Sequence, residues 1–151
     1  MLWQWSGLAG WLANGLALSA LGGVVWSLRY YDGSEFIGLR QWREGERSVE
    51  DQERFQISEL HRFVRHPWYS LGLVLVWTRD MDRVFLITAI LITLYFIIGI
   101  WMEEKKLAIY HGEPYRRYRK LVPALVPLPW RFLAREEARE IQAEAEREAD
   151  G

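Results

Sequence analysis

Two long stretches without charge constrain the fold more than any other feature of this sequence. Residues 1–28 contain no charged side chain, and residues 84–102, "VFLITAILITLYFIIGIWM", are equally free of charge. About 20 consecutive apolar residues are needed to cross the hydrocarbon core of a bilayer. Both stretches are therefore predicted to be transmembrane helices. The first lacks a basic leading region and is longer than the apolar core of a secretory signal, so we do not expect it to be one.

A third apolar run, "PWYSLGLVLVWT" (67–78), is shorter. Its twelve residues would cover only about 18 Å as a helix, which suits the short arm of a hairpin with 84–102 and a turn at 79–82. Pro67 fits the first turn of that arm, where a missing N–H costs nothing. His66 directly precedes the proline and is disfavoured as helical, so it marks the boundary.

The predicted fold is therefore all-α and integral to the membrane. It has one N-terminal transmembrane helix (about 2–28), a transmembrane helical hairpin (67–78 and 84–102) and short cytoplasmic helices after it. Residues 1–134 are expected to form the membrane domain. Residues 135–151 are rich in Arg, Glu and Ala with opposite charges four residues apart, which predicts a solvated C-terminal helix or tail.

The distribution of positive charge predicts the orientation. Residues 29–65 contain seven arginines and residues 105–135 contain eight Lys or Arg, whereas the hairpin turn is flanked only by Arg79 and Arg83. The positive-inside rule places the two basic regions in the cytoplasm and the N-terminus outside. We expect a multi-pass protein of the cytoplasmic (inner) membrane. Residues 44–59, "EGERSVEDQERFQISE", are polar and predict a loop or an exposed helix.

Several classes of site are excluded or disfavoured. The chain has no cysteine, which excludes disulfides, iron–sulfur clusters, thiolate metal sites and cysteine catalysis. His61 and His66 lie outside the apolar spans and have no partner histidine within them, so neither a metal nor a haem is expected. No nucleic-acid partner is expected either.

The predicted hairpin brings two sets of polar groups together. Arg65 and His66 stand at the start of one arm, and Glu103 and Glu104 stand at the end of the other. A pair of acids can hold amino or hydroxyl groups, and an Arg–His pair can hold a carboxylate. This arrangement is plausible for a small zwitterionic cofactor. Aromatic faces for an adenine ring or a cation are supplied by Tyr69, Tyr115 and Tyr118.

Structural interpretations of the same residues stay open. Arg62 and Arg65 can act as interfacial anchors that reach lipid headgroups. Glu103 and Glu104 can pair with neighbouring lysines on a wet helix end. Tyr115 and Tyr118, three residues apart, are also typical of packing at an interface.

The order of these groups resembles one family of membrane methyltransferases. These proteins are related to isoprenylcysteine carboxyl methyltransferase and include phospholipid methyltransferases, methanethiol S-methyltransferases and the NnrU-type proteins. The stretch "FIGLRQ" (36–41) is also similar to the methanethiol branch, and the resemblance covers roughly residues 30–128. The matching pieces are Arg65-His66-Pro67-Trp68-Tyr69, Glu103-Glu104-Lys105-Lys106-Leu107, Gly112-Glu113-Pro114-Tyr115-Arg116-Arg117-Tyr118 and Val122-Pro123.

The resemblance implies methyl transfer from S-adenosylmethionine. On this basis we expect a small or lipophilic acceptor that enters from the lipid, with a thiol, a carboxylate and a lipid amine all open. We expect the cofactor to enter from the cytoplasm. Two alternatives are a non-catalytic NnrU-like membrane protein and a partner-binding subunit, and a homo-oligomer is compatible with each. The implied cofactor-binding residues are Arg65, His66, Pro67, Tyr69, Glu103, Glu104, Tyr115 and Tyr118.

The chain departs from the family pattern at two positions. Leu71 stands where the family usually has glycine, with Gly72 following, and His111 stands where the family usually has phenylalanine. One interpretation of His111 is a helix end, since Gly112 suits a left-handed cap. The other is catalytic: the imidazole accepts a proton from the incoming nucleophile at neutral pH.

Overall fold

The computed structural model describes residues 1–28 and 55–149. The predictions for "FIGLRQ" (36–41) and for most of the polar stretch 44–59 lie outside these residues. Within the described residues the chain forms helices and no β-strand beyond two isolated bridges, which confirms the predicted all-α class. The helices are α1 (Gly7–Ser27), the short 3-10 helix η3 (Leu60–Arg62), α4 (Pro67–Trp77), α5 (Arg83–Tyr110), α6 (Gly112–Leu121) and α7 (Arg135–Ala149).

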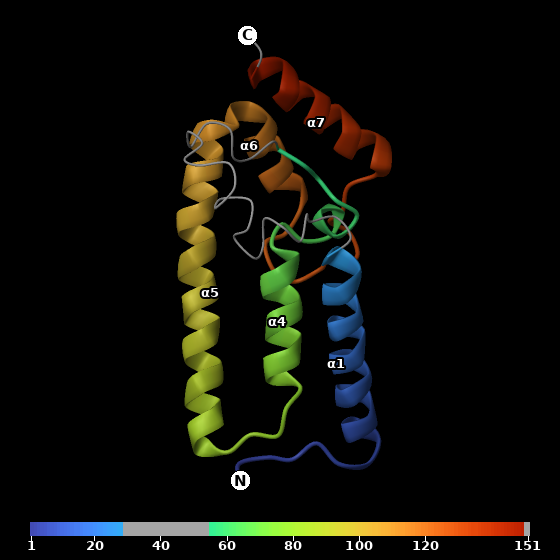
Figure 1. The fold of residues 1–151 in the computed structure, drawn as a ribbon, viewed down its shortest axis with the longest axis vertical. Helices are drawn as coiled ribbons and strands as arrows, with labels where there is room; N and C mark the ends of the chain where they lie inside the picture. Colours follow the sequence, from blue (N-terminus) through green and yellow to red (C-terminus); the bar gives the residue numbers. More distant parts are fainter. Residues whose placement is uncertain (29–54, 150–151) are drawn as a thin grey trace, which may run out of the picture.

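Three helices lie side by side, with α4 antiparallel to α1 and α5 (Figure 1). The N-terminal segment is tied to the turn between α4 and α5, because the backbone N–H groups of Leu2 and Trp3 donate to the carbonyl of Met81. The N–H of Met81 donates back to the carbonyl of Trp3. This end of the bundle therefore holds the start of α1 and the α4–α5 turn. The opposite end holds the start of α4, together with α6 and α7 (Figure 1).

Local chemistry explains where α4 and α5 begin. Pro67 occupies the first position of α4, and His66 has φ −122° and ψ 70°, outside the helical region, as expected before a proline. Asp82 caps α5 by accepting a hydrogen bond from the N–H of Phe85 at 2.7 Å. The helix runs to Tyr110, well past the predicted end of the span at residue 102. The sequence after that point consists of good helix formers, so the loss of hydrophobicity does not end the helix.

Two of the helices are suited to a lipid environment. Both α1 and α5 are long and apolar enough to cross a membrane, and α4 is a shorter apolar helix. Only 11% of the apolar window of α5 is buried and 22% of that of α1. The core helix of a water-soluble protein would be mostly buried, and α5 lies far from the N-terminus, so it is not a signal sequence. These exposed apolar surfaces indicate a membrane protein.

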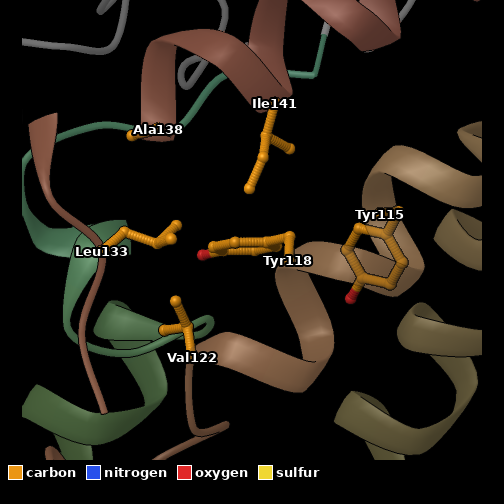
Figure 2. Close-up of a cluster of buried hydrophobic side chains, with 6 residues drawn as sticks. All are labelled: Tyr115, Tyr118, Val122, Leu133, Ala138 and Ile141. Atoms are coloured by element: carbon orange, nitrogen blue, oxygen red, sulfur yellow. The ribbon is translucent and has the colours of Figure 1, made fainter. Parts of the chain in front are cut away.

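A hydrophobic cluster joins α6 and α7 at the end of the bundle that carries the candidate site (Figure 2). The ring of Tyr118 lies at its centre, with side chains from the end of α6, the following segment and α7 around it. The C-terminal helix forms over nearly the predicted range, but one of its faces is buried in this cluster rather than solvated. The buried members are Tyr115, Tyr118, Val122, Leu133, Ala138 and Ile141.

Candidate functional site

A buried ion cluster connects the start of α4 with α5 and α6. The guanidinium of Arg65 lies 2.5 Å (Nη2) and 2.8 Å (Nε) from Oε1 of Glu104. Oε2 of the same carboxylate lies 3.0 Å from Nε of Arg119. The side chains of Arg65 and Glu104 are only 9% and 6% exposed. The two sets of polar groups expected at the ends of the hairpin arms are thus in direct contact.

His66 lies between the two glutamates. Its Nε2 is 3.3 Å from Oε1 of Glu104, and its Nδ1 is 3.4 Å from Oε2 of Glu103. Burial lowers the pKa of His66, but hydrogen bonds to the two carboxylates and their charge outweigh burial and raise it above its ordinary value. The site therefore favours an imidazolium held by two acids.

The Val-Pro pair of the sequence pattern also contributes to this cluster. Val122 is extended (φ −109°, ψ 133°), as the residue before a proline prefers. Its carbonyl accepts a hydrogen bond from the Arg65 guanidinium. The carbonyls of Pro123 and Ala124 accept from the backbone N–H groups of Arg65 (2.9 Å) and His66 (3.0 Å). The segment after α6 thus fixes the position of the Arg-His pair.

Few hydrogen-bond donors and acceptors of Arg65 and Glu104 are left for a ligand. Of the five N–H donors of a guanidinium, Arg65 directs its Nε and one Nη2 donor at Glu104. Its two Nη1 donors point to the carbonyls of Arg119 and Val122. Both carboxylate oxygens of Glu104 are engaged as well. The structure shows these two residues joining the start of α4 to α5 and α6, and their direct contact with a cofactor stays a prediction.

Beside the cluster is a pocket of about 190 Å³. Glu103 is the carboxylate on its wall, and its side chain is 45% exposed. Sites for small molecules usually enclose about 300–1,000 Å³, so the described residues have room for part of a molecule the size of S-adenosylmethionine. The lining residues are His61, Arg65, His66, Pro67, Trp68, Tyr69 and Glu103.

An aromatic stack extends from the pocket into the helical bundle. The ring of Tyr69 lies parallel to that of His66, with centroids 5.7 Å apart. The ring of Tyr69 also stacks on that of Phe96 of α5, with centroids 4.7 Å apart. Aromatic faces attract cations and exclude water. Tyr69 lines the pocket, and its contact with a cofactor stays a prediction.

Tyr115 and Tyr118 lie in the hydrophobic cluster and do not line the pocket. The hydroxyl of Tyr118 donates to the backbone carbonyl of His61 at 2.6 Å. The hydroxyl of Tyr115 is buried and has no hydrogen-bond partner within the described part of the chain. Burial raises the pKa of both phenols. Their packing fits the structural interpretation, and their contact with a cofactor remains a prediction.

Sequence reasoning did not assign His61, Trp68 or Arg119 to the site. His61 lies on the pocket wall with its Nδ1 2.7 Å from the hydroxyl of Ser58, and burial lowers its pKa to about 4. It precedes Arg65 by four residues, which is a weak signal for a shared location. Arg119 has no such signal, because its role depends on how α6 packs against α5.

His111 is the residue at which α5 ends and α6 begins. Its N–H donates to the carbonyl of Leu107 at 2.9 Å, and its ring lies 5.3 Å from that of Phe55. Gly112 adopts φ +54°, the left-handed conformation expected of a glycine cap. His111 does not line the pocket. This placement corresponds to the helix-end interpretation, and the catalytic interpretation remains untested.

Replacing His111 by phenylalanine separates these two interpretations. We expect unchanged turnover between pH 6 and 8, because phenylalanine keeps an aromatic contact with Phe55 and the backbone cap does not involve the imidazole. General-base catalysis contributes about 10²–10⁴-fold. A loss of about a hundredfold with unchanged cofactor affinity would therefore assign the base to His111.

The raised pKa of His66 predicts a pH dependence of stability. The fold favours the protonated imidazole. The contribution of His66 to stability is therefore complete below the unfolded pKa of about 6.5 and is lost as the pH rises through the higher folded pKa. His66→Gln should therefore destabilise the protein most at pH 6 and least at alkaline pH, measured as the unfolding midpoint. A difference in unfolding midpoint between His66→Gln and wild type that stays constant from pH 6 to alkaline pH would contradict the assignment of charge to His66.

The lowered pKa of His61 predicts the opposite trend for that residue. The contribution of His61 to stability is present above about pH 6.5 and is lost as the pH falls toward 4.

The fold and the site together define a class: an all-helical membrane protein with a buried Arg–His–Glu cluster beside a pocket walled by aromatic rings. Curated relatives identify the family more closely. The chain is 32% identical over 143 residues to the methanethiol S-methyltransferase of Crocosphaera subtropica, a match that covers 84% of this chain and 55% of the relative. It is 33% identical over 147 residues to that of Mycobacterium tuberculosis, covering 87% and 59%.

A shorter match, 38% identical over 98 residues, is to the methanethiol S-methyltransferase of a Pseudomonas species, covering 62% of this chain and 36% of that protein. These findings confirm the resemblance predicted from the sequence: the chain is a relative of the methanethiol S-methyltransferases. It spans about half the length of the curated relatives it matches. No family model and no solved structure matches it.

Proposed function

We propose that this chain acts in the transfer of a methyl group from S-adenosylmethionine to a thiol at a membrane. The observation that supports this most strongly is the position of the similarity. A match that covers 84% of 151 residues leaves out only about 24, so residues 25–127 fall inside it. The pocket and the buried ion cluster therefore lie within the part that resembles proteins named for this reaction.

The residues of the pocket suit the charged groups of the proposed cofactor. Glu103 offers a partly exposed carboxylate for an ammonium group. The remaining N–H of Arg65 suits a carboxylate. The ring of Trp68, on the pocket wall, suits a sulfonium cation. When bound, S-adenosylmethionine supplies an electrophilic methyl group.

The chain itself contributes orientation and exclusion of water. Tyr69, on the pocket wall, stacks on Phe96 of α5 and adds apolar surface there, and a dry site favours a reaction in which charge is neutralised. Holding the two reactants in line accounts for most of the acceleration in such a displacement. A thiol is proposed over a carboxylate or a lipid amine because the relatives are named for a thiol acceptor.

Calorimetry on the purified full chain in nanodiscs, titrated with S-adenosylhomocysteine, tests the cofactor. A screen with a labelled methyl donor and thiol, carboxylate and lipid-amine acceptors then tests the reaction. Wild type should bind the analogue and methylate the thiol, and Glu140→Gln on an exposed position of α7 should behave like wild type. A chain that binds no analogue would support the non-catalytic alternative.

We also propose that the end of the bundle carrying the pocket faces the cytoplasm. The basic residues of α6 and the lysines that follow Trp101 gather at that end, as the positive-inside rule requires. Reporter fusions after Leu28, at Met81 and at Gly151 should report inside, outside and inside. A Gly151 fusion that reports outside would contradict both this orientation and entry of the cofactor from the cytoplasm.

A further inference from the structure

The segment 126–132, "VPLPWRF", presents an unusual surface for a loop. Val126, Trp130 and Phe132 are 66%, 76% and 52% exposed, and the two prolines of the segment are exposed as well. Arg131, its one charged residue, is half-buried and donates from its guanidinium to the backbone carbonyl of Lys120. Contiguous exposed apolar side chains mark a surface that contacts a membrane or another protein.

Both ends of this segment are tied to residues that flank the start of α4. Before it, the carbonyl of Leu125 accepts a hydrogen bond from the hydroxyl of Ser70, in the first turn of α4 (2.7 Å). After it, the N–H of Leu133 donates to the carbonyl of Arg62 (3.0 Å). In Figure 1 the orange segment that follows α6 reaches the level of the first turn of α4. The loop therefore lies at the level where the apolar part of α4 begins.

The helix α5 indicates that this level is a membrane boundary. Trp101 follows Arg83 by 18 residues, or about 27 Å of helix, close to the roughly 30 Å of a hydrocarbon core. The ammonium of Lys105 lies over the ring of Trp101, 3.5 Å from its centroid. An exposed tryptophan beside a lysine is typical of the headgroup region. Glu103 and Glu104, just past this boundary, contact His66, the residue before α4.

The backbone of the loop is also suited to an environment with little water. An unpaired N–H group in lipid costs several kcal/mol, on the order of a lost hydrogen bond. Pro127 and Pro129 have no N–H to satisfy, and the N–H of Arg131 donates to the carbonyl of Leu128. Three of its seven residues therefore have no unpaired backbone N–H, which lowers the cost of placing the segment where water is scarce.

We infer that residues 126–132, with the neighbouring ring of Phe63, insert into the interfacial zone of the bilayer that holds α1 and α5, on the side of the candidate site. Phe63 is 45% exposed and stacks on Phe132 at 6.2 Å, which extends the apolar surface. Exposed cations border it: Arg119 and Lys120 lie at the end of α6. This combination of apolar tip and basic rim is complementary to lipid tails and anionic headgroups.

The absence of cysteine from the whole chain allows a direct test. Trp130→Cys and Phe132→Cys are spin-labelled separately in the full chain, reconstituted in nanodiscs, and their exposure to oxygen and to a water-soluble nickel complex is measured. Leu91→Cys, exposed near the middle of the apolar stretch 84–102 of α5, and Glu140→Cys, exposed on α7, give the lipid and water references. The loop labels should lie between the two references, about 5–10 Å below the headgroup surface.

Two outcomes would overturn the inference. Nickel exposure equal to that of the Glu140 label would place the loop in water. If the loop labels are less exposed than the Leu91 label both to oxygen and to the nickel complex, protein, such as a second copy or a partner, covers the loop. Phe63→Cys on the other side of the patch gives an independent measurement if one variant fails to fold. The result does not depend on the chemistry of the pocket, so it is separable from the methyl-transfer assay.

Discussion

Replacing Glu104 by alanine should destabilise the protein by about 3–5 kcal/mol, the usual cost of removing one partner of a buried ion pair. The carboxylate of Glu104 is 6% exposed and lies against Arg65, Arg119 and His66. Its removal leaves three cationic groups close together with much less compensation. The effect on function should follow from loss of the fold, because Glu104 holds Arg65 and His66 in place and does not itself line the pocket.

Urea unfolding of the variant and wild type in the same detergent measures this difference. Glu113→Ala is the matched control: its carboxylate is 66% exposed and 3.6 Å from Arg116, so we expect a change within about 0.5 kcal/mol. Glu104→Gln should recover part of the stability, since the amide oxygen still accepts hydrogen bonds. A Glu104→Ala protein as stable as wild type that no longer binds cofactor would instead make Glu104 a direct ligand contact.

The helices of the membrane part were predictable because their signals are local. The charge-free runs gave α1 and α5, and Pro67 with His66 before it gave the start of α4. The end of α5 was not predictable from hydropathy, because the stretch from Glu103 to Ala108 changes polarity while keeping high helix propensity. Loss of hydrophobicity thus marks a change of environment along one continuous helix.

The contact between the Arg-His pair and the two glutamates followed from the hairpin, but the division of roles did not. Neighbouring residues on a helix point about 100° apart, so Glu104 turns into the ion cluster while Glu103 turns toward the pocket. Which glutamate faces the cluster depends on the rotation of α5 about its axis, and thus on how α4 packs against α5, which no local pattern encodes. The same applies to Val122 and Arg119, which reach Arg65 only because α6 folds back on α5.

Glu103→Gln should weaken cofactor binding by about tenfold or more while leaving the unfolding midpoint near that of wild type. Glu103 is the carboxylate among the residues that line the pocket, and its side chain is 45% exposed. A hydrogen bond to a charged group contributes about 1.5–3 kcal/mol, and about 1.4 kcal/mol corresponds to tenfold in affinity. Within the described part of the chain Glu103 pairs with His66, which keeps Glu104, so the fold should tolerate the change.

Titrating this variant with both S-adenosylmethionine and S-adenosylhomocysteine shows which group Glu103 contacts. The two ligands share the ammonium group, but the second has no sulfonium charge. Equal losses of affinity would place Glu103 at the ammonium group, and a larger loss for S-adenosylmethionine would place it near the sulfonium. Glu113→Gln should leave both affinities unchanged. Wild-type affinity of Glu103→Gln for both ligands would remove this carboxylate, and with it the pocket beside His66, from the proposed cofactor site.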